Sequence, residues 1–120
     1  MKRVFYLENG MLFIHDAGRI EPPEYQDAAF SFNDQCISIR AKHEQEGRCQ
    51  VTLGPLSQVG LQRPADLIHP IKTKNRQVII TLVAGDPVMI LPVSTDSTRL
   101  AIWLNNSNEA DKIVIGAEPG

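Results

Sequence analysis

The amino-acid sequence predicts an all-β protein, an antiparallel β-sandwich of about eight or nine short strands. Short apolar runs recur along the chain, and turn-forming residues separate them roughly every 8 to 12 residues. No segment repeats apolar residues at helical spacing for three turns. The clearest strands are the β-branched runs 78–83 and 88–93, which flank a turn at 84–87. These two runs are predicted to be central strands with both faces largely covered.

The length and composition indicate one globular domain over residues 1–120. The chain is 42% hydrophobic and 22% charged, which are ordinary values for a folded protein, and 120 residues are enough to bury a core without metals or cross-links. The net charge of −2 argues against a dedicated nucleic-acid binder, which usually carries a basic patch. No second domain is expected.

The chain carries no sign of export or membrane insertion. The charged and polar residues Glu8, Asn9 and Gly10 interrupt the apolar N-terminal stretch, so it does not resemble a signal peptide. No apolar run approaches the length of a membrane span. Cys36 and Cys49 are the only cysteines and do not make a disulfide framework. A cytoplasmic location is therefore expected.

The first third of the chain is predicted to begin with a hairpin. Strands at 2–8 and 11–16 flank Asn9-Gly10, the strongest short hairpin signal. Residues 17–26 contain one glycine and two prolines and are predicted to form a loop. The aromatic segment 28–32 is either a short strand or a plug for the core.

The rest of the chain is predicted to be strands with polar connections. A second hairpin is expected from strands at 35–41 and 48–53, followed by a crossover at 54–64. Pro70 cannot donate a ladder hydrogen bond, so 66–73 is predicted to be an edge strand. The remaining predicted strands are 77–83, 88–93, 99–105 and 112–116, and the tail 117–120 is expected to fray.

Alternation within strands predicts which side chains face the core. Leu100, Ile102 and Leu104 share one face of their strand. If the apolar faces of 35–41 and 48–53 meet in one core, Cys49 points inward and Cys36 outward. The two thiols then cannot form a disulfide, and Cys36 is expected to be the more accessible one.

The sequence contains no convergent set of catalytic or metal-binding residues. His15 and Asp16 are adjacent in a strand, face opposite ways, and are interpreted as a pair on the surface at a strand end. The scattered histidines and cysteines match no zinc pattern, and no nucleophile elbow or phosphate-binding loop is present. We therefore expect no enzymatic activity, no metal and no cofactor.

Charge is unevenly distributed along the chain. Residues 16–39 carry five acidic side chains against Arg19, a net charge of −4, whereas residues 40–76 carry seven basic against three acidic side chains, a net charge of +4. Such segments predict a dipolar surface, which favours steered association with a charged protein.

The acidic segment is the predicted partner-binding site. Carboxylates surround Tyr25, Phe30 and Phe32, a composition common in sites that bind a basic partner. In the alternative, both phenylalanines simply fill the core. The predicted partner-binding residues are Asp16, Glu21, Glu24, Tyr25, Asp27 and Asp34.

Two other functions fit the same sequence. Trp103 and Tyr25 are candidate stacking platforms for a small ligand or a carbohydrate. The edge strand 66–73 could instead pair with another chain in a larger assembly.

The order of segments resembles the competence protein J family, small inhibitors of the nuclease used in bacterial transformation. The resemblance covers roughly residues 11–115 and rests on a strand leading to Pro22-Pro23, the segment 35–53, and four later strands that include Leu91-Pro92 and Trp103. It implies a cytoplasmic inhibitor or immunity-type protein that binds a nuclease or toxin. The resemblance identifies no individual inhibitory residue.

Overall fold

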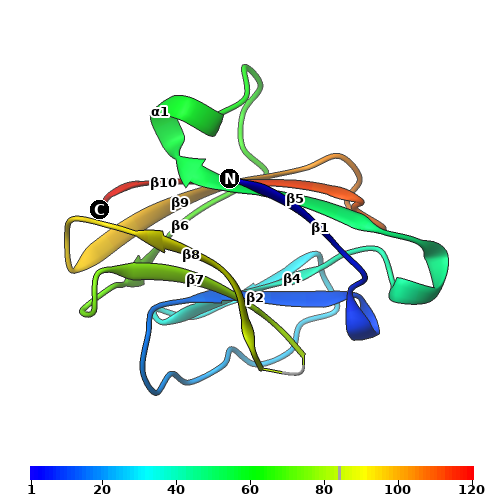
Figure 1. Cartoon of the computed structure of the whole chain (residues 1–120), viewed down its shortest axis with the longest axis horizontal. Coiled ribbons are helices and arrows are strands. Elements are labelled where there is room, and N and C mark those ends of the chain that lie inside the picture. Colours follow the sequence, from blue (N-terminus) through cyan, green and yellow to red (C-terminus); the bar gives the residue numbers. More distant parts are fainter. Residues whose placement is uncertain (84) are drawn as a thin grey trace.

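The computed structural model describes residues 1–83 and 85–120, apart from the side chain of Glu44. Within these residues ten strands form two five-stranded sheets that pack face to face (Figure 1). The predicted all-β sandwich is therefore confirmed, with one or two more strands than expected. Ala84, part of the predicted turn 84–87, lies outside the described residues.

The two sheets are named here by their position in Figure 1. The upper sheet contains, in spatial order, β1 (Lys2–Phe5), β5 (Cys49–Pro55), β10 (Lys112–Pro119), β9 (Ser97–Leu104) and β6 (Leu67–Lys72). The lower sheet contains β3 (Phe30–Phe32), β4 (Cys36–Arg40), β2 (Met11–His15), β7 (Gln77–Leu82) and β8 (Pro87–Pro92). Paired strands are antiparallel except β5 and β10, which run parallel.

Helical structure is confined to short turns. The helical elements in the described residues are η1 (Glu8–Gly10), η2 (Glu44–Glu46) and α1 (Leu56–Val59). None of the helices described is long and apolar enough to cross a membrane. The predicted crossover 54–64 thus contains one helical turn, packed against β10 and β5 on the outside of the upper sheet (Figure 1).

The predicted hairpin at Asn9-Gly10 is wrong, although the turn itself forms. Asn9 and Gly10 have φ values of 57° and 64°, and the Met11 amide donates to the Glu8 carbonyl, as in the turn that Asn-Gly favours. However, β1 pairs with β5, whereas β2 pairs with β4 and β7. Leu7, just before the turn, is fully buried in the shared core. The chain therefore passes from one sheet to the other instead of returning alongside itself.

The second predicted hairpin is also wrong. β4 belongs to the lower sheet and β5 to the upper sheet, so the charged segment 41–48 connects the two layers. The Ala41 amide donates to the Gly10 carbonyl (2.7 Å), and the Lys42 amide donates to the Ala110 carbonyl (2.9 Å). Each backbone bond ties the connection to a different part of the fold, and neither requires β4 and β5 to pair.

The core lies between the sheets and follows the predicted alternation. Leu100, Ile102 and Leu104 are buried in it, as are Cys49, Val51 and Leu53. The predicted inward faces of these strands are confirmed. Period-2 alternation is a local property of a strand, so it survives even where the pairing of strands was predicted incorrectly.

The structure confirms the predicted edge position of β6 but not the predicted central position of β8. β6 is an edge strand, as Pro70 predicted. β7 is buried on both faces, but its neighbour β8 is an edge strand with Ile90 45% exposed, so the prediction that 88–93 is central is wrong. Pro87 and Pro92 bound β8. Because proline lacks an amide hydrogen, both residues suit an edge.

The C-terminal tail does not fray. β10 pairs with β9 as far as Pro119, which lies opposite Thr98, and the Gly120 amide donates to the Ser97 carbonyl (2.9 Å). The pairing with β9 extends a strand predicted to end at residue 116. The predicted fraying is therefore wrong, because the long partner β9 supplies backbone acceptors along the whole tail.

Both cysteines are free and fully buried. Cys49 faces the core, as predicted. Cys36 faces away from the core, also as predicted, but it is not accessible, because the outer face of the lower sheet is covered at this point. Burial is the main cause that raises the pKa of each thiol, in both cases to about 11.

A thiol reagent is expected to label neither cysteine readily in the native protein. Only the thiolate reacts, and a pKa of about 11 instead of 9.0 lowers the thiolate fraction near neutral pH by about 100-fold. Labelling should be slow for both residues and become rapid for both in denaturant, measured by mass spectrometry of the separated peptides. Rapid native labelling of Cys36 alone would show that its cover opens easily.

Candidate functional site

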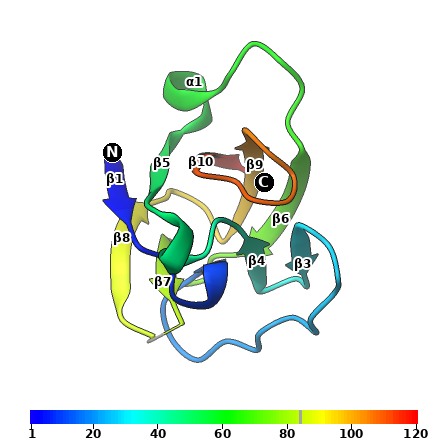
Figure 2. The same ribbon diagram turned by 90° about the vertical axis from the view of Figure 1, so that its right-hand side faces the viewer.

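The candidate site is the loop of residues 17–29, which joins β2 to β3. The loop crosses the outer face of the lower sheet and is the outermost part of the molecule on that side (Figures 1 and 2). Ser38 and Thr81 face away from the core and are nevertheless buried. A loop of this length is unusual in a compact domain, and when it is ordered it is usually functional.

The carboxylate of Asp16 holds the start of this loop. Its Oδ1 accepts hydrogen bonds from the amides of Ala17 (2.8 Å) and Gln77 (3.3 Å), and its Oδ2 accepts one from the amide of Asn75 (2.8 Å). The residue is only 4% exposed. Asp16 was interpreted as part of a surface pair with His15, and that interpretation is wrong. The carboxylate oxygens of Asp16 accept hydrogen bonds from three backbone amides, and these bonds position the loop.

His15 is also engaged within the fold. Its Nδ1 donates to the backbone carbonyl of Asp16 (2.7 Å), and its Nε2 lies 3.1 Å from the hydroxyl oxygen of Thr81. Both ring nitrogens are therefore used. Among the described residues, no group of three or more His, Cys, Asp or Glu side chains is placed to hold a metal ion.

The middle of the loop is anchored by side chains of β3 and of the turn between β3 and β4. The Glu21 amide donates to Oε1 of Gln35 (3.0 Å), and Nδ2 of Asn33 donates to the Glu21 carbonyl (3.0 Å). Further along, the Gln26 amide donates to Oγ of Ser31 (2.9 Å). These bonds use the backbone of the loop and leave the Glu21 and Glu24 side chains exposed to solvent.

Two of the predicted acidic residues are paired with basic residues from the segment of opposite charge. Asp27 lies 2.8 Å from the guanidinium of Arg40, and Asp34 lies 2.8 Å from the ammonium of Lys72. A hydrogen bond from Lys72, reinforced by its charge, lowers the pKa of Asp34. The pKa of Arg40 is raised mainly by its hydrogen bond with Asp27 and, to a smaller extent, by the Tyr25 hydroxyl. The two charged segments thus partly neutralise each other.

The aromatic residues of the acidic segment separate into two environments. Phe30 packs against the core, whereas Phe32 is 47% exposed and its ring lies 4.4 Å from that of His69 in β6. Tyr25 is 64% exposed. One phenylalanine therefore contributes to the core, and Tyr25 and Phe32 are the aromatic surfaces available to a partner.

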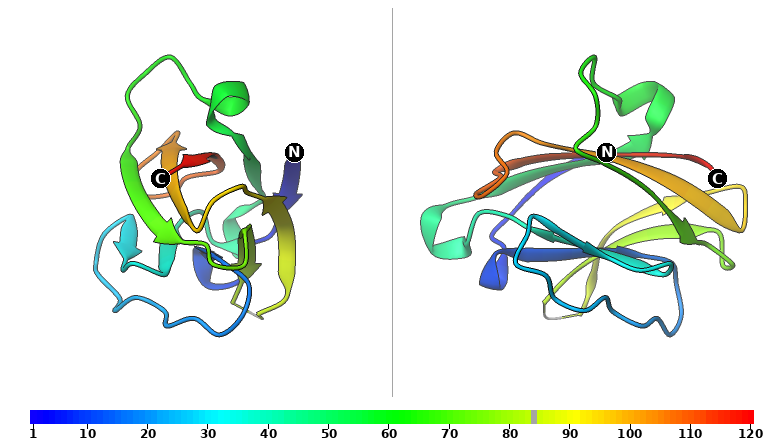
Figure 3. Two further views of the ribbon diagram at one scale, coloured as in Figure 1. Left: turned by 90° about the vertical axis from the view of Figure 1, so that its left-hand side faces the viewer. Right: turned by 180° about the vertical axis from the view of Figure 1, so that it is seen from behind.

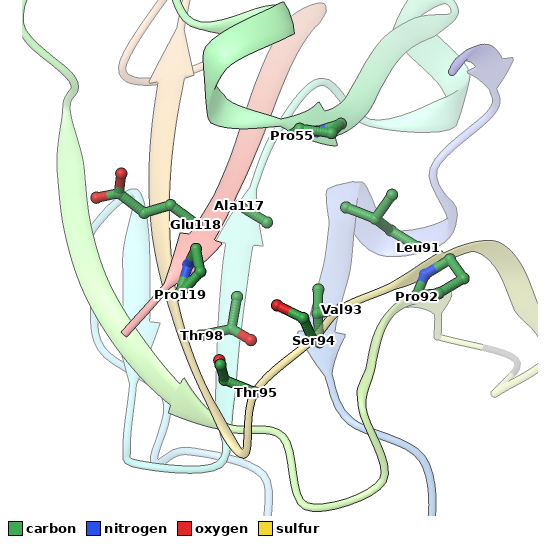
Figure 4. Close-up of a pocket in the computed structure, with 10 residues that line it drawn as sticks. All are labelled: Pro55, Leu91, Pro92, Val93, Ser94, Thr95, Thr98, Ala117, Glu118 and Pro119. Atoms are coloured by element: carbon green, nitrogen blue, oxygen red, sulfur yellow. The ribbon is translucent and has the colours of Figure 1, made fainter.

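An apolar cavity of about 360 Å³ lies between β8 and the end of β10 (Figure 4). The two threonine hydroxyls in its wall are used within the fold. The hydroxyls of Thr98 and Thr73 are 2.8 Å apart, and the Thr95 hydroxyl donates to the Ser97 carbonyl (2.6 Å). The sequence did not indicate this cavity, because one wall is formed by the tail that was expected to fray. It brings no reactive groups together.

The environment of Trp103 does not suit a stacking platform. The side chain is 5% exposed, its Nε1 donates to the Arg63 carbonyl (2.7 Å), and segment 56–66 lies over this face of the upper sheet (Figure 3). The neighbouring concavity of about 670 Å³ is lined by Trp103 together with Arg63, Lys112 and other residues. Tyr25 belongs to the loop outside the opposite sheet, so the two aromatic residues cannot form one carbohydrate site.

These features define a two-sheet β-sandwich with a long, anchored loop outside one sheet. A comparison with known protein families finds no match, and a comparison with curated proteins finds none either. A solved structure with a similar fold is ComJ from Bacillus subtilis, described as an inhibitor of the DNA-degrading activity of NucA. The similarity covers 98% of this chain and 93% of that chain, with a TM-score of 0.68 and 11% sequence identity. The predicted resemblance to the competence protein J family is thereby confirmed at the level of the fold.

Proposed function

We propose that this protein is a non-enzymatic inhibitor that binds a nuclease through loop 17–29. The observation that carries the proposal is the similarity to ComJ over almost the full length of both chains. A β-sandwich with no convergent reactive groups among its described residues is consistent with a binding protein. We further propose that it acts in the cytoplasm of a bacterium.

Glu21 and Glu24 are the residues proposed to contact a basic surface first. Both are exposed, and neither forms an ion pair with another described residue. Their charges are therefore available for a partner. Because the loop backbone is already anchored, binding costs less conformational entropy than it would for a free loop.

Tyr25, Asp27 and Asp34 are assigned supporting roles. Tyr25 offers an exposed aromatic surface, and tyrosine is one of the residues enriched at the centres of interfaces. Asp27 and Asp34 must exchange their present partners, Arg40 and Lys72, for basic groups of the nuclease. Exposed ion pairs are weak, so this exchange costs little. Asp16 acts indirectly by holding the loop in place.

The proposed mechanism is steric and electrostatic. A nuclease binds the phosphates of its substrate with basic side chains. Carboxylates of the loop that occupy those side chains exclude the substrate, and the body of the sandwich blocks its approach. Opposite charges also speed the encounter, and salt screening slows it.

Reversing two loop charges tests the proposal. The Glu21→Lys/Glu24→Lys variant is expected to raise the concentration for half-inhibition of the partner nuclease by at least about tenfold, because attraction is replaced by repulsion. DNA degradation by the nuclease encoded beside this protein, or captured on the immobilised chain, supplies the assay. The effect should shrink between about 50 mM and about 300 mM salt.

The matched control is Glu46→Lys/Glu109→Lys, which makes the same charge change at exposed residues outside the loop. This variant should inhibit like the wild type. Equal inhibition by the loop variant would exclude loop 17–29 as the binding site. Absence of inhibition by the wild-type chain, with no binding to the nuclease, would reject the proposed function itself.

A further inference from the structure

We infer that a polar concavity at the base of loop 17–29 binds a small oxyanion of the phosphate class. The concavity has a volume of about 190 Å³ and lies where the start of the loop meets β6 and the turn between β6 and β7. Its walls contain Arg19, Lys72 and Lys74 together with the amides of Gln35 and Asn75. This inference does not rest on the proposed function.

Three cations from separate segments converge on this one hollow. Arg19 comes from the loop, Lys72 from the end of β6, and Lys74 from the turn that follows. Among the described residues, Arg19 and Lys74 form no ion pair, and Lys72 shares its charge with Asp34 at 2.8 Å. Like charges held together repel, and a bound anion relieves that repulsion. The wall of a concavity also focuses their field.

The one carboxylate that lines the hollow offsets one of the three positive charges, which leaves a formal charge of +2 on the lining side chains. Asp16 already accepts hydrogen bonds from the backbone amides of Ala17, Asn75 and Gln77. These bonds hold the carboxylate in place, and among the described residues it forms no ion pair with Arg19, Lys72 or Lys74. Asp16 also positions Asn75, the residue next to Lys74, against the start of the loop.

The two amides add neutral hydrogen-bond donors. Oε1 of Gln35 accepts from the Glu21 amide (3.0 Å), so Nε2 is the end of this lining side chain that can donate to a ligand. Nδ2 of Asn75 donates one hydrogen to the Ala17 carbonyl (2.8 Å), and its second hydrogen remains for a ligand. Cations together with amide donors are the groups that bind the oxygens of phosphate.

The size of the hollow selects a small ligand. Drug-sized ligands occupy pockets of about 300 Å³ or more. At about 190 Å³ the hollow is smaller than this and large enough for one tetrahedral oxyanion. Glu21 and Glu24, exposed further along the same loop, repel a long polyanion. The geometry therefore favours free phosphate over a phosphate within a nucleic acid.

The test is a titration of the protein with inorganic phosphate, followed by NMR at constant ionic strength adjusted with chloride. We expect saturable shifts of the Arg19, Lys74 and Asn75 backbone amides, with a Kd on the order of 1 mM for so small a ligand. A dinucleotide monophosphate is the second probe. If it displaces phosphate, the source is a nucleic acid phosphate; if it does not, the source is the free anion.

The Arg19→Gln/Lys74→Gln variant should raise the Kd for phosphate at least tenfold. Both residues are exposed, so the fold should be retained. The matched control, Lys2→Gln/Lys112→Gln, removes the same charge from exposed residues of the upper sheet and should bind phosphate like the wild type. Unsaturable shifts in the wild type, or equal loss in both variants, would overturn the inference. Neither readout involves the nuclease.

Discussion

Replacing Asp16 with alanine is expected to lower the free energy of unfolding by about 3 kcal/mol, because a buried donor left without a partner costs about 1–3 kcal/mol. The substitution removes the acceptor of three backbone amides, those of Ala17, Asn75 and Gln77. Water can reach part of this site once the carboxylate is gone, so the three costs should not add in full. Urea unfolding followed by circular dichroism measures the change.

Two variants show whether this effect belongs to the hydrogen bonds. Asp16→Asn keeps the shape and one acceptor oxygen, so its loss should be intermediate. Glu21→Ala removes an exposed acid from the same segment and should change stability by no more than about 0.5 kcal/mol. If Asp16→Ala is as stable as the wild type, Asp16 does not anchor the loop. Its proposed indirect role in binding the nuclease would then be wrong.

Trp103→Ala should produce the largest loss of stability, about 3–5 kcal/mol, the usual cost of removing a buried large aromatic side chain. The indole is 5% exposed, lies under segment 56–66, and donates to the Arg63 carbonyl at 2.7 Å. Its removal leaves a cavity and releases that segment from the upper sheet. Trp103 is the one tryptophan of the chain, so the variant has no tryptophan fluorescence and its unfolding must be followed by circular dichroism.

Tyr25→Ala is the matched control, because Tyr25 is an aromatic residue that is 64% exposed. Its stability should stay within about 0.5 kcal/mol of the wild type. Trp103→Phe should lose less than Trp103→Ala, since it keeps one aromatic ring in place, although it removes the donor and part of the indole volume. A Trp103→Ala variant that is as stable as Tyr25→Ala would mean that the indole contributes little to the packing of segment 56–66.

The candidate loop could be located from the sequence, but the role of each residue in it could not. Two prolines, a glycine and the lack of alternation predicted an irregular segment after residue 16, and the acidic residues were evident from composition. Which carboxylates are free depends on residues distant in the sequence. Lys72 reaches Asp34 and the backbone around Asn75 reaches Asp16, and neither contact leaves a local pattern.

The predicted dipolar surface also depended on contacts between residues that are distant in the sequence. Residues 16–39 and 40–76 carry opposite net charges, but the fold brings Asp27 to Arg40 and Asp34 to Lys72. Each pair joins the two segments. Opposite charges attract at short range, so segments that differ in sign are also those that pair best. The net charge of a segment therefore overestimated the charge of the surface. Within residues 16–39, Glu21 and Glu24 are the exposed acids that form no ion pair with another described residue.

Local patterns in the sequence were sufficient to predict the all-β class, the inward faces of β4, β5 and β9, and the edge position of β6. These are local properties: alternation follows from the pleat of a strand, and a proline excludes a ladder bond wherever it lies. The tertiary structure alone decided which strands pair. Asn9-Gly10 forms its turn, but burial of Leu7 in the shared core sends the flanking strands to opposite sheets. Burial and pairing depend on residues far apart in the chain, so no local signal could specify them.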